Sequence, residues 1–191
     1  MIDAEARDAD LLLRIRLPYY AGMSREYREN LIGLAIALAV ALARLSSNVL
    51  LSNVARFYIS IIRGTPLLVQ LFIVFYALPE LGVKIDPFPA AVIAFSLNVG
   101  GYGAEIIRSA IQSIPKGQWE AATSLNLSTA RTYFRVIIPQ AVPPSLAGMG
   151  NYLIGIFKDT PMLSVIGVAE LMHTANAIGS ETYRFLEPYT L

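Results

Sequence analysis

The chain has 191 residues, of which 55% are hydrophobic and only 15% are charged, and its mean hydropathy is +0.53. A soluble domain carries about 25% charged residues, so this composition favours a membrane protein, and at about 20 apolar residues per span four to six spans are the most that fit. A net charge of +1 gives no electrostatic case for nucleic-acid binding, while the absence of cysteine and the single histidine, His173, exclude disulfides, thiolate metal sites and imidazole clusters.

Residues 1–30 form a polar N-terminal segment with six acidic and five basic side chains. The apolar residues at 11–17 could form a short interfacial helix that Pro18 would end, or the segment could be a weakly ordered tail. It lacks the short basic region and apolar core of a cleaved signal peptide.

Four apolar stretches are predicted to be membrane spans. The first, at 31–43, is shorter than the 17–25 residues that a span needs, although Ser24 could cap a longer helix. The others are predicted at 65–78, where Pro79 ends the helix, at 88–107 and at 136–157. Beyond them, residues 158–186 contain an apolar stretch that is too short to cross, and another apolar segment begins near the end of the sequence.

Glycine and proline mark two of these spans. Gly100, Gly101 and Gly103 in the third span should let a neighbouring backbone approach closely. Pro139, Pro143 and Pro144 are expected near the start of the fourth helix, where missing N–H groups cost least, with a kink at Pro144.

The charges predict the orientation of the chain. The segments 44–63 and 108–135 hold seven basic residues against one acidic residue, whereas the alternate segments hold three basic residues against six acidic ones. The positive-inside rule therefore places 44–63 and 108–135 in the cytoplasm as loops and the N-terminus outside.

Several ordered motifs resemble those of bacterial ABC importer permeases. Residues 120–122, Glu-Ala-Ala, followed by Ile-Pro at 138–139, resemble the EAA loop of these proteins. The runs 63–70 (RGTPLLVQ), 113–119 (SIPKGQW) and 158–160 (KDT) are similar to the polar amino-acid branch, which includes permeases for histidine, glutamine, arginine and opines.

The resemblance covers roughly residues 31–190 and implies a fold and a function. The fold would be all-α, a polytopic helix bundle of the type I ABC importer permease (MetI-like) kind, with a permease domain at 31–191 and about four spans present. The function would be import of polar amino acids across the bacterial cytoplasmic (inner) membrane by alternating access. Family members have a complete first span and a further last span, so part of the first and all of the last are expected to be missing.

The same resemblance implies the partners. They are an ABC ATPase that binds ATP and Mg, a second permease, identical or related, and an extracytoplasmic solute-binding protein. The chain itself is expected to bind no cofactor and to be no enzyme, because it has no glycine-rich phosphate loop with its lysine, and no nucleophile–base pair within the spans. The alternative is a non-transporting membrane scaffold or an inactive truncated permease fragment.

In the loop 108–135, a short helix starting after Pro115 should carry Trp119, Ala122 and Leu125 on one face at i, i+3 and i+6. Its small alanines would let it sit deep in a groove of the ATPase, where Glu120 could meet a basic side chain; an ordinary amphipathic loop helix is the alternative. Ser128 should cap a second helix. The family usually has glycine where this chain has Asn126, which also tolerates the left-handed conformation. The candidate coupling residues are Lys116, Gly117, Trp119, Glu120, Ala121, Ala122, Asn126 and Pro139.

Polar side chains within the spans are candidates for a substrate pathway, because such groups are costly in a bilayer. For Glu105 a local ion pair with Arg108 at i+3 is an equal alternative, and the two asparagines could instead bond neighbouring helices. Arg63 is interpreted as an interfacial side chain rather than a pathway residue. The pathway candidates are Gln70, Asn98, Tyr102, Glu105 and Asn151, and the candidates for an outer gate, or alternatively an interfacial anchor, are Lys158, Asp159 and Thr160.

Overall fold

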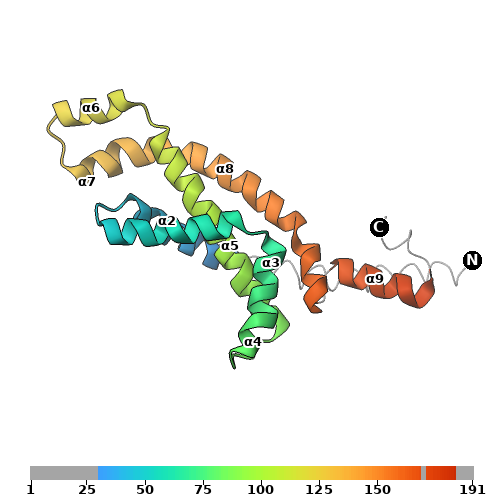
Figure 1. Ribbon diagram of the computed structural model, residues 1–191. Helices are drawn as coiled ribbons and strands as arrows, with labels where there is room; N and C mark the ends of the chain where they lie inside the picture. Colours follow the sequence, from blue (N-terminus) through green and yellow to red (C-terminus); the bar gives the residue numbers. More distant parts are fainter. Residues whose placement is uncertain (1–29, 169–170, 184–191) are drawn as a thin grey trace, which may run out of the picture.

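The computed structural model describes residues 30–168 and 171–183, and every regular element within these ranges is helical (Figure 1). The expected segment at 1–29 and the apolar segment near the end of the chain lie outside them. The elements in chain order are a helix at Asn30–Leu45, α2 at Val49–Gly64, α3 at Leu67–Phe72, η1 at Ile73–Ala77, α4 at Leu78–Glu80, α5 at Pro87–Gln112, α6 at Lys116–Ser124, α7 at Thr129–Thr132, η2 at Tyr133–Ile137, α8 at Ile138–Lys158, η3 at Thr160–Ile166 and α9 at Leu171–Thr182.

Helix α5 is the central element of the bundle. It has 26 residues, about 39 Å of helix at 1.5 Å per residue, and it is the one described helix that is by itself long and apolar enough to cross a bilayer. The pair formed by α2 and the α3–α4 segment passes the same test as one broken span, and the helix Asn30–Leu45 is apolar but shorter. Each predicted span therefore coincides with a helical segment.

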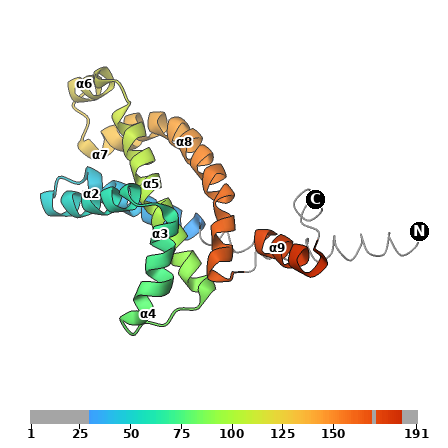
Figure 2. The same cartoon turned by 45° about the vertical axis from the view of Figure 1, so that its right-hand side comes forward.

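The segment 44–63, predicted to be a loop, is mostly the helix α2. Its start is defined by Asn48, whose side chain accepts hydrogen bonds from the backbone N–H groups of Leu50 and Leu51. It ends because the backbone before Pro66 is held extended, with Thr65 at φ −120° and ψ 138°. The chain bends there by 106°, so α2 crosses α5 while α3 follows a different direction (Figures 1 and 2).

Prolines lie inside two continuous helical runs, each just after a π-helical turn. The π-helical segments η1 and η2 end two residues before Pro79 and Pro139, and in each the residue before the proline donates to the carbonyl five positions back. A proline cannot donate to the carbonyl four residues back and clashes with it, and the wider turn removes this conflict.

The predicted roles of these prolines therefore need correction. Pro79 lies within a helix that runs on to Glu80. Pro139 is the second residue of α8, near its start as predicted, whereas Pro143 and Pro144 lie inside that helix. Helix α8 curves along its length (Figure 2).

The predicted close approach at the glycines of α5 is confirmed. A Cβ atom at Gly100 would lie 2.4 Å from Cγ2 of Ile36, and one at Gly103 would lie 2.7 Å from Cβ of Ala37, so the helix Asn30–Leu45 packs directly on the backbone of α5. On another side, a Cβ atom at Gly101 would lie 2.5 Å from Cγ2 of Ile62 on α2. Any larger residue at these three positions would force the helices apart.

The polar hairpin stands at one end of the molecule and is shorter than predicted, because α5 continues to Gln112 rather than ending at 107. Helices α6 and α7 lie at this end in both views, far from α4 and α9 (Figures 1 and 2). A hydrophobic cluster of Ile111, Ile114 and Ile137 joins the end of α5 to η2 beneath α6. The hairpin is thus attached to both long helices, α5 and α8.

Candidate functional site

Three helices are joined by a buried chain of hydrogen-bonded side chains. The amide of Asn98 on α5 donates to Oε1 of Gln70 on α3 at 3.0 Å, and the hydroxyl of Tyr152 on α8 donates to Oδ1 of Asn98 at 2.5 Å. Gln70 and Asn98 are 8% and 4% exposed, respectively. The two amides therefore link α3, α5 and α8 within an apolar interior.

Gln70 also holds the bend between α2 and α3. Its Nε2 donates to the carbonyl of Ile62 at 2.8 Å and to both the carbonyl and the hydroxyl of Thr65 at 3.0 Å. Helix α2 ends at this point, so its last carbonyls have no partner within the helix. The predicted pathway residue Gln70 thus satisfies backbone groups that the bend leaves free.

Next to this series of hydrogen-bonded side chains lies a cluster of charged residues, centred on Glu105 of α5. The guanidinium of Arg108 binds Glu105 with N–O distances of 2.8 and 2.5 Å, which is the i, i+3 ion pair considered as an alternative. Arg63, at the end of α2, also reaches Glu105 at 3.4 Å and lies 5.7 Å from the ring centre of Tyr102. Tyr102 in turn stacks on Tyr152, with ring centres 5.1 Å apart and an angle of 14° between the planes.

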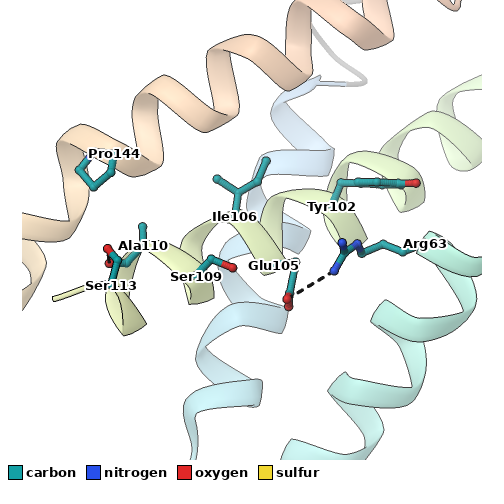
Figure 3. Close-up of a pocket in the computed structure, with 8 residues that line it drawn as sticks. All are labelled: Arg63, Tyr102, Glu105, Ile106, Ser109, Ala110, Ser113 and Pro144. Carbon is teal, nitrogen blue, oxygen red and sulfur yellow. Dashed lines mark hydrogen bonds and ion pairs between the residues drawn. The ribbon is translucent and has the colours of Figure 1, made fainter.

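Three of these side chains, Arg63, Tyr102 and Glu105, line an open pocket of about 410 Å³ between α5, α8 and the end of α2. In Figure 3 the carboxylate of Glu105 and the guanidinium of Arg63 face one another beside the ring of Tyr102, and Pro144 lies on the opposite helix. One wall thus offers a cation, an anion and an aromatic face. The lining residues are Arg63, Tyr102, Glu105, Ile106, Ser109, Ala110, Ser113 and Pro144.

The predicted pathway residues are only partly brought together. Gln70, Asn98, Tyr102 and Glu105 form one continuous group, whereas Asn151 lies on an exposed face of α8, outside it. The sequence reasoning missed Tyr152, which takes the place expected of Asn151. A signal was present, since Gly148, four residues earlier on the same helical face, marks the side of α8 that packs closely on Ile106.

Helix α6 begins after Pro115, as predicted, and is anchored to the chain by one face. The ring of Trp119 meets that of Tyr133 edge to face at 5.3 Å, Ala122 is 2% exposed, and Gln140 on α8 donates to the side chain of Gln118 at 3.1 Å.

The opposite face of α6 is exposed and carries Lys116, Gly117, Glu120 and Ala121. Two expectations are therefore wrong: Ala122 packs on its own chain instead of facing outward, and Leu125, which is 74% exposed, does not share the buried face of Trp119 and Ala122. The helix ends before Leu125 could continue the i, i+3, i+6 pattern.

The turn after α6 confirms the prediction for Asn126. Its φ of 51° is in the left-handed region. The backbone N–H of Leu127 bonds the carbonyl of Ala122 at 3.1 Å, and that of Asn126 bonds the carbonyl of Thr123 at 2.9 Å, which is the Schellman pattern of a helix end. Ser128 occupies the predicted N-cap position of α7, but its side chain makes no capping hydrogen bond.

The outer candidates lie at the other end of α8 and turn the chain into η3. Thr160 donates its hydroxyl to the carbonyl of Phe157 at 2.9 Å, and the carbonyl of Asp159 accepts from the N–H of Met162 at 3.0 Å. Lys158 is the exposed last residue of α8. His173 lies further along, on α9.

Comparison with known proteins places this geometry in a family. Residues 32–186 match the family described as binding-protein-dependent transport system inner membrane component. The L-cystine transport system permease protein TcyB of Bacillus subtilis (strain 168) is 53% identical over 148 residues, which are 78% of this chain and 63% of TcyB. The putative glutamine transport system permease protein GlnP of Rickettsia typhi (strain ATCC VR-144 / Wilmington) is 39% identical over 83% of this chain and 73% of its own length.

Solved structures agree with these relatives. A crystal structure of an amino acid ABC transporter with histidines matches with a TM-score of 0.90 and 38% identity over 98% of this chain and 86% of that one. An inward-facing MetNI methionine ABC transporter matches with a TM-score of 0.75 at 16% identity, over 95% of this chain and 88% of that one, which shows the shared fold alone. The fold is that of a type I importer permease, and the chain belongs to the family of binding-protein-dependent transport system inner membrane components.

Proposed function

We propose that this chain is the permease subunit of an ATP-driven importer for polar amino acids in a bacterial cytoplasmic membrane. The names of the relatives, which include a cystine and a glutamine permease, support the class of substrate. The observation that carries the proposal is the geometry of α6, a short helix that stands clear of the bundle with one face anchored and the other free.

The free face of α6 suits docking to a separate ATPase. Glu120 and Ala121 are exposed side by side, so a carboxylate can meet an arginine or lysine while the alanine permits close approach. Lys116 and Gly117 extend this surface at the start of the helix. ATP and Mg would be bound by that ATPase.

The anchored face of α6 can transmit movement to the spans. Three residues connect α6 to the end of α5, and the contacts of Trp119 with Tyr133 and of Gln118 with Gln140 tie it to η2 and α8. Displacement of α6 would therefore move α5 and α8 together, and the pocket between these helices would change shape. This is the hinge and shear motion that alternating access requires.

The pocket has groups suited to a zwitterionic amino acid. Arg63 could bind the carboxylate of the substrate, Glu105 its ammonium group, and Tyr102 could pack on its side chain. Gln70 and Asn98 lie behind this wall and would position it through Tyr152. Asn151 faces away from the pocket and could contribute only on an outer surface.

The remaining partners follow from the same proposal. A second permease, identical or related, would complete the pore across a two-fold axis. An extracytoplasmic solute-binding protein would deliver the substrate at the end of the molecule away from α6, where Lys158, Asp159 and Thr160 turn the chain out of α8. With α6 in the cytoplasm, the N-terminus would lie outside.

The docking of α6 can be tested by reversing one charge. Glu120→Lys should abolish co-purification of the ATPase and leave membrane insertion intact, because the side chain is exposed on the free face of α6. Glu80→Lys is the matched control, since Glu80 is also exposed but lies on α4, at the opposite end of the molecule. Unchanged co-purification of the ATPase with Glu120→Lys would refute the docking role.

A further inference from the structure

A second pocket, of about 270 Å³, lies on another side of the same cluster of charged residues, where three helices meet. Successive turns of α2 contribute Arg56, Ser60 and Arg63, which have the spacing of residues on one helical face. Helix α5 contributes Glu105 and Arg108, and the helix Asn30–Leu45 contributes an arginine from its last turn. The complete lining is Arg44, Arg56, Ile59, Ser60, Arg63, Glu105 and Arg108.

The pocket carries a large excess of positive charge. Four guanidinium groups line it with one carboxylate, and Glu105 is already bound by Arg108 and Arg63. Arg44 donates to the hydroxyl of Ser52 at 2.9 Å, which is a neutral partner, and within the described part of the chain no carboxylate pairs with Arg44 or Arg56. Four cations lining one pocket with a single carboxylate leave it with a net positive charge, so the site suits an anion.

An apolar stripe on α2 runs beside the row of arginines. Leu50, Val54, Phe57 and Ile61, at i, i+4, i+7 and i+11, are all exposed. They occupy the neighbouring face of the helix, because Phe57 directly follows Arg56 and Ile61 directly follows Ser60. A ligand that combines an anionic group with hydrocarbon chains could therefore contact both surfaces of α2 at once.

We propose that this pocket binds the phosphate of an anionic phospholipid, with the acyl chains lying along the stripe of Leu50, Val54, Phe57 and Ile61. Basic pockets between the cytoplasmic ends of spans are suited to such head groups, and a guanidinium can bind phosphate oxygens with two hydrogen bonds. The adjoining apolar stripe favours a lipid over a free phosphate ion or an acidic peptide, neither of which would cover it. The proposal requires only that the chain lies in a membrane, and is independent of what it transports.

The test uses the full chain in neutral detergent and measures its affinity for phosphatidylglycerol and phosphatidylcholine by native mass spectrometry. The chain should retain phosphatidylglycerol in preference. Arg56→Gln, which removes a guanidinium without a described partner, should weaken that binding about fivefold. Arg131→Gln is the matched control, because Arg131 is exposed on α7 outside the pocket and its loss should leave the affinity unchanged.

A second pair of variants distinguishes a loss of lipid binding from a folding defect. Ser60→Glu places a second carboxylate in the pocket and should abolish the preference for phosphatidylglycerol, whereas Ser60→Gln, of nearly the same size, should retain it. Equal affinity for the two lipids, an equal effect of Arg131→Gln, or full displacement of the lipid by inorganic phosphate would each overturn the proposal. Failure of the chain to insert into membranes would overturn both this proposal and the proposed function, whereas loss of transport with lipid binding retained would contradict the function alone.

Discussion

The buried amides of Gln70 and Asn98 set the contact between α3, α5 and α8. Asn98→Leu would leave Gln70 without a donor to its Oε1 and Tyr152 without its acceptor. A buried polar group left unpaired costs about 1–3 kcal/mol, so the midpoint of thermal unfolding in detergent should fall by roughly 2–12 °C. Asn151→Leu, the same change at an exposed position of α8, should leave the midpoint nearly unchanged. Equal midpoints for the two variants would mean that the amide chain contributes nothing to stability.

For single residues, the sequence indicated which polar side chains lie inside the spans better than it indicated which side chains they contact. The cost of polar groups in a bilayer singled out Gln70, Asn98, Tyr102 and Glu105, and the structure joins these residues in one group. It did not distinguish Asn151 from Tyr152, because α8 is apolar on most sides and the π-helical turn at its base shifts the phase of every later residue. The left-handed turn at Asn126 was expected from the glycine that the family usually has at this position and from the tolerance of asparagine for that conformation.

The contacts of Arg63 could not be predicted from its position in the sequence. Its position as the first residue of the RGTP run indicated an interfacial side chain, and the structure adds contacts with Glu105 and Tyr102. These contacts depend on the 106° bend after α2, which turns the end of that helix toward α5. A bend angle is a tertiary property, and no local pattern specifies it.

Helix α6 is held to the bundle by the edge-to-face contact of Trp119 with Tyr133, by the buried side chain of Ala122 and by one hydrogen bond between side chains. Trp119→Ala removes the edge-to-face contact with Tyr133, which is worth about 0.5–1.5 kcal/mol beyond the area that it buries. Local opening of α6 should therefore become roughly 2- to 10-fold more frequent. Amide hydrogen exchange across Lys116–Ser124 would measure this change.

Leu125→Ala is the control for that experiment. Leu125 lies directly after α6 and is largely exposed, so its truncation should leave exchange in α6 unaltered. If exchange in α6 were the same in Trp119→Ala as in the unmodified chain, the helix would have to be held by other contacts, and the proposed transmission through Tyr133 would lose its basis.

The spans were predicted more accurately than the segments between them. Long apolar runs gave the positions of α5 and α8, and the glycines of α5 correctly indicated where other helices approach. Helix α2 was missed because its arginines and short length favoured a cytoplasmic loop, although it buries Ala55, Ile59 and Ile62 at helical spacing. Pro143 and Pro144 lie deeper in a continuous helical run than predicted, because the π-helical turn that extends the run before α8 has no clear sequence signal.

For the whole molecule, the proposed orientation in the bilayer rests on the unequal distribution of basic residues between alternate segments of the chain. The chain has no cysteine, so single cysteines introduced at Lys84 and Lys116 report their own positions. An impermeant thiol reagent should label position 84 from outside in intact cells and position 116 only after the membrane is opened. Labelling in the reverse order would invert the topology and would place α6 beyond the reach of a cytoplasmic ATPase.

The central claim is that α6 transmits an ATP-driven movement to the pocket between α5 and α8. The most direct test is the labelling rate of Ser109→Cys, at the exposed wall of that pocket, in the chain reconstituted with its ATPase. Addition of ATP should slow labelling from the cytoplasmic side, and Glu120→Lys in the same background should remove this effect. A rate that is indifferent to ATP, or equally slowed with Glu120→Lys, would contradict the account.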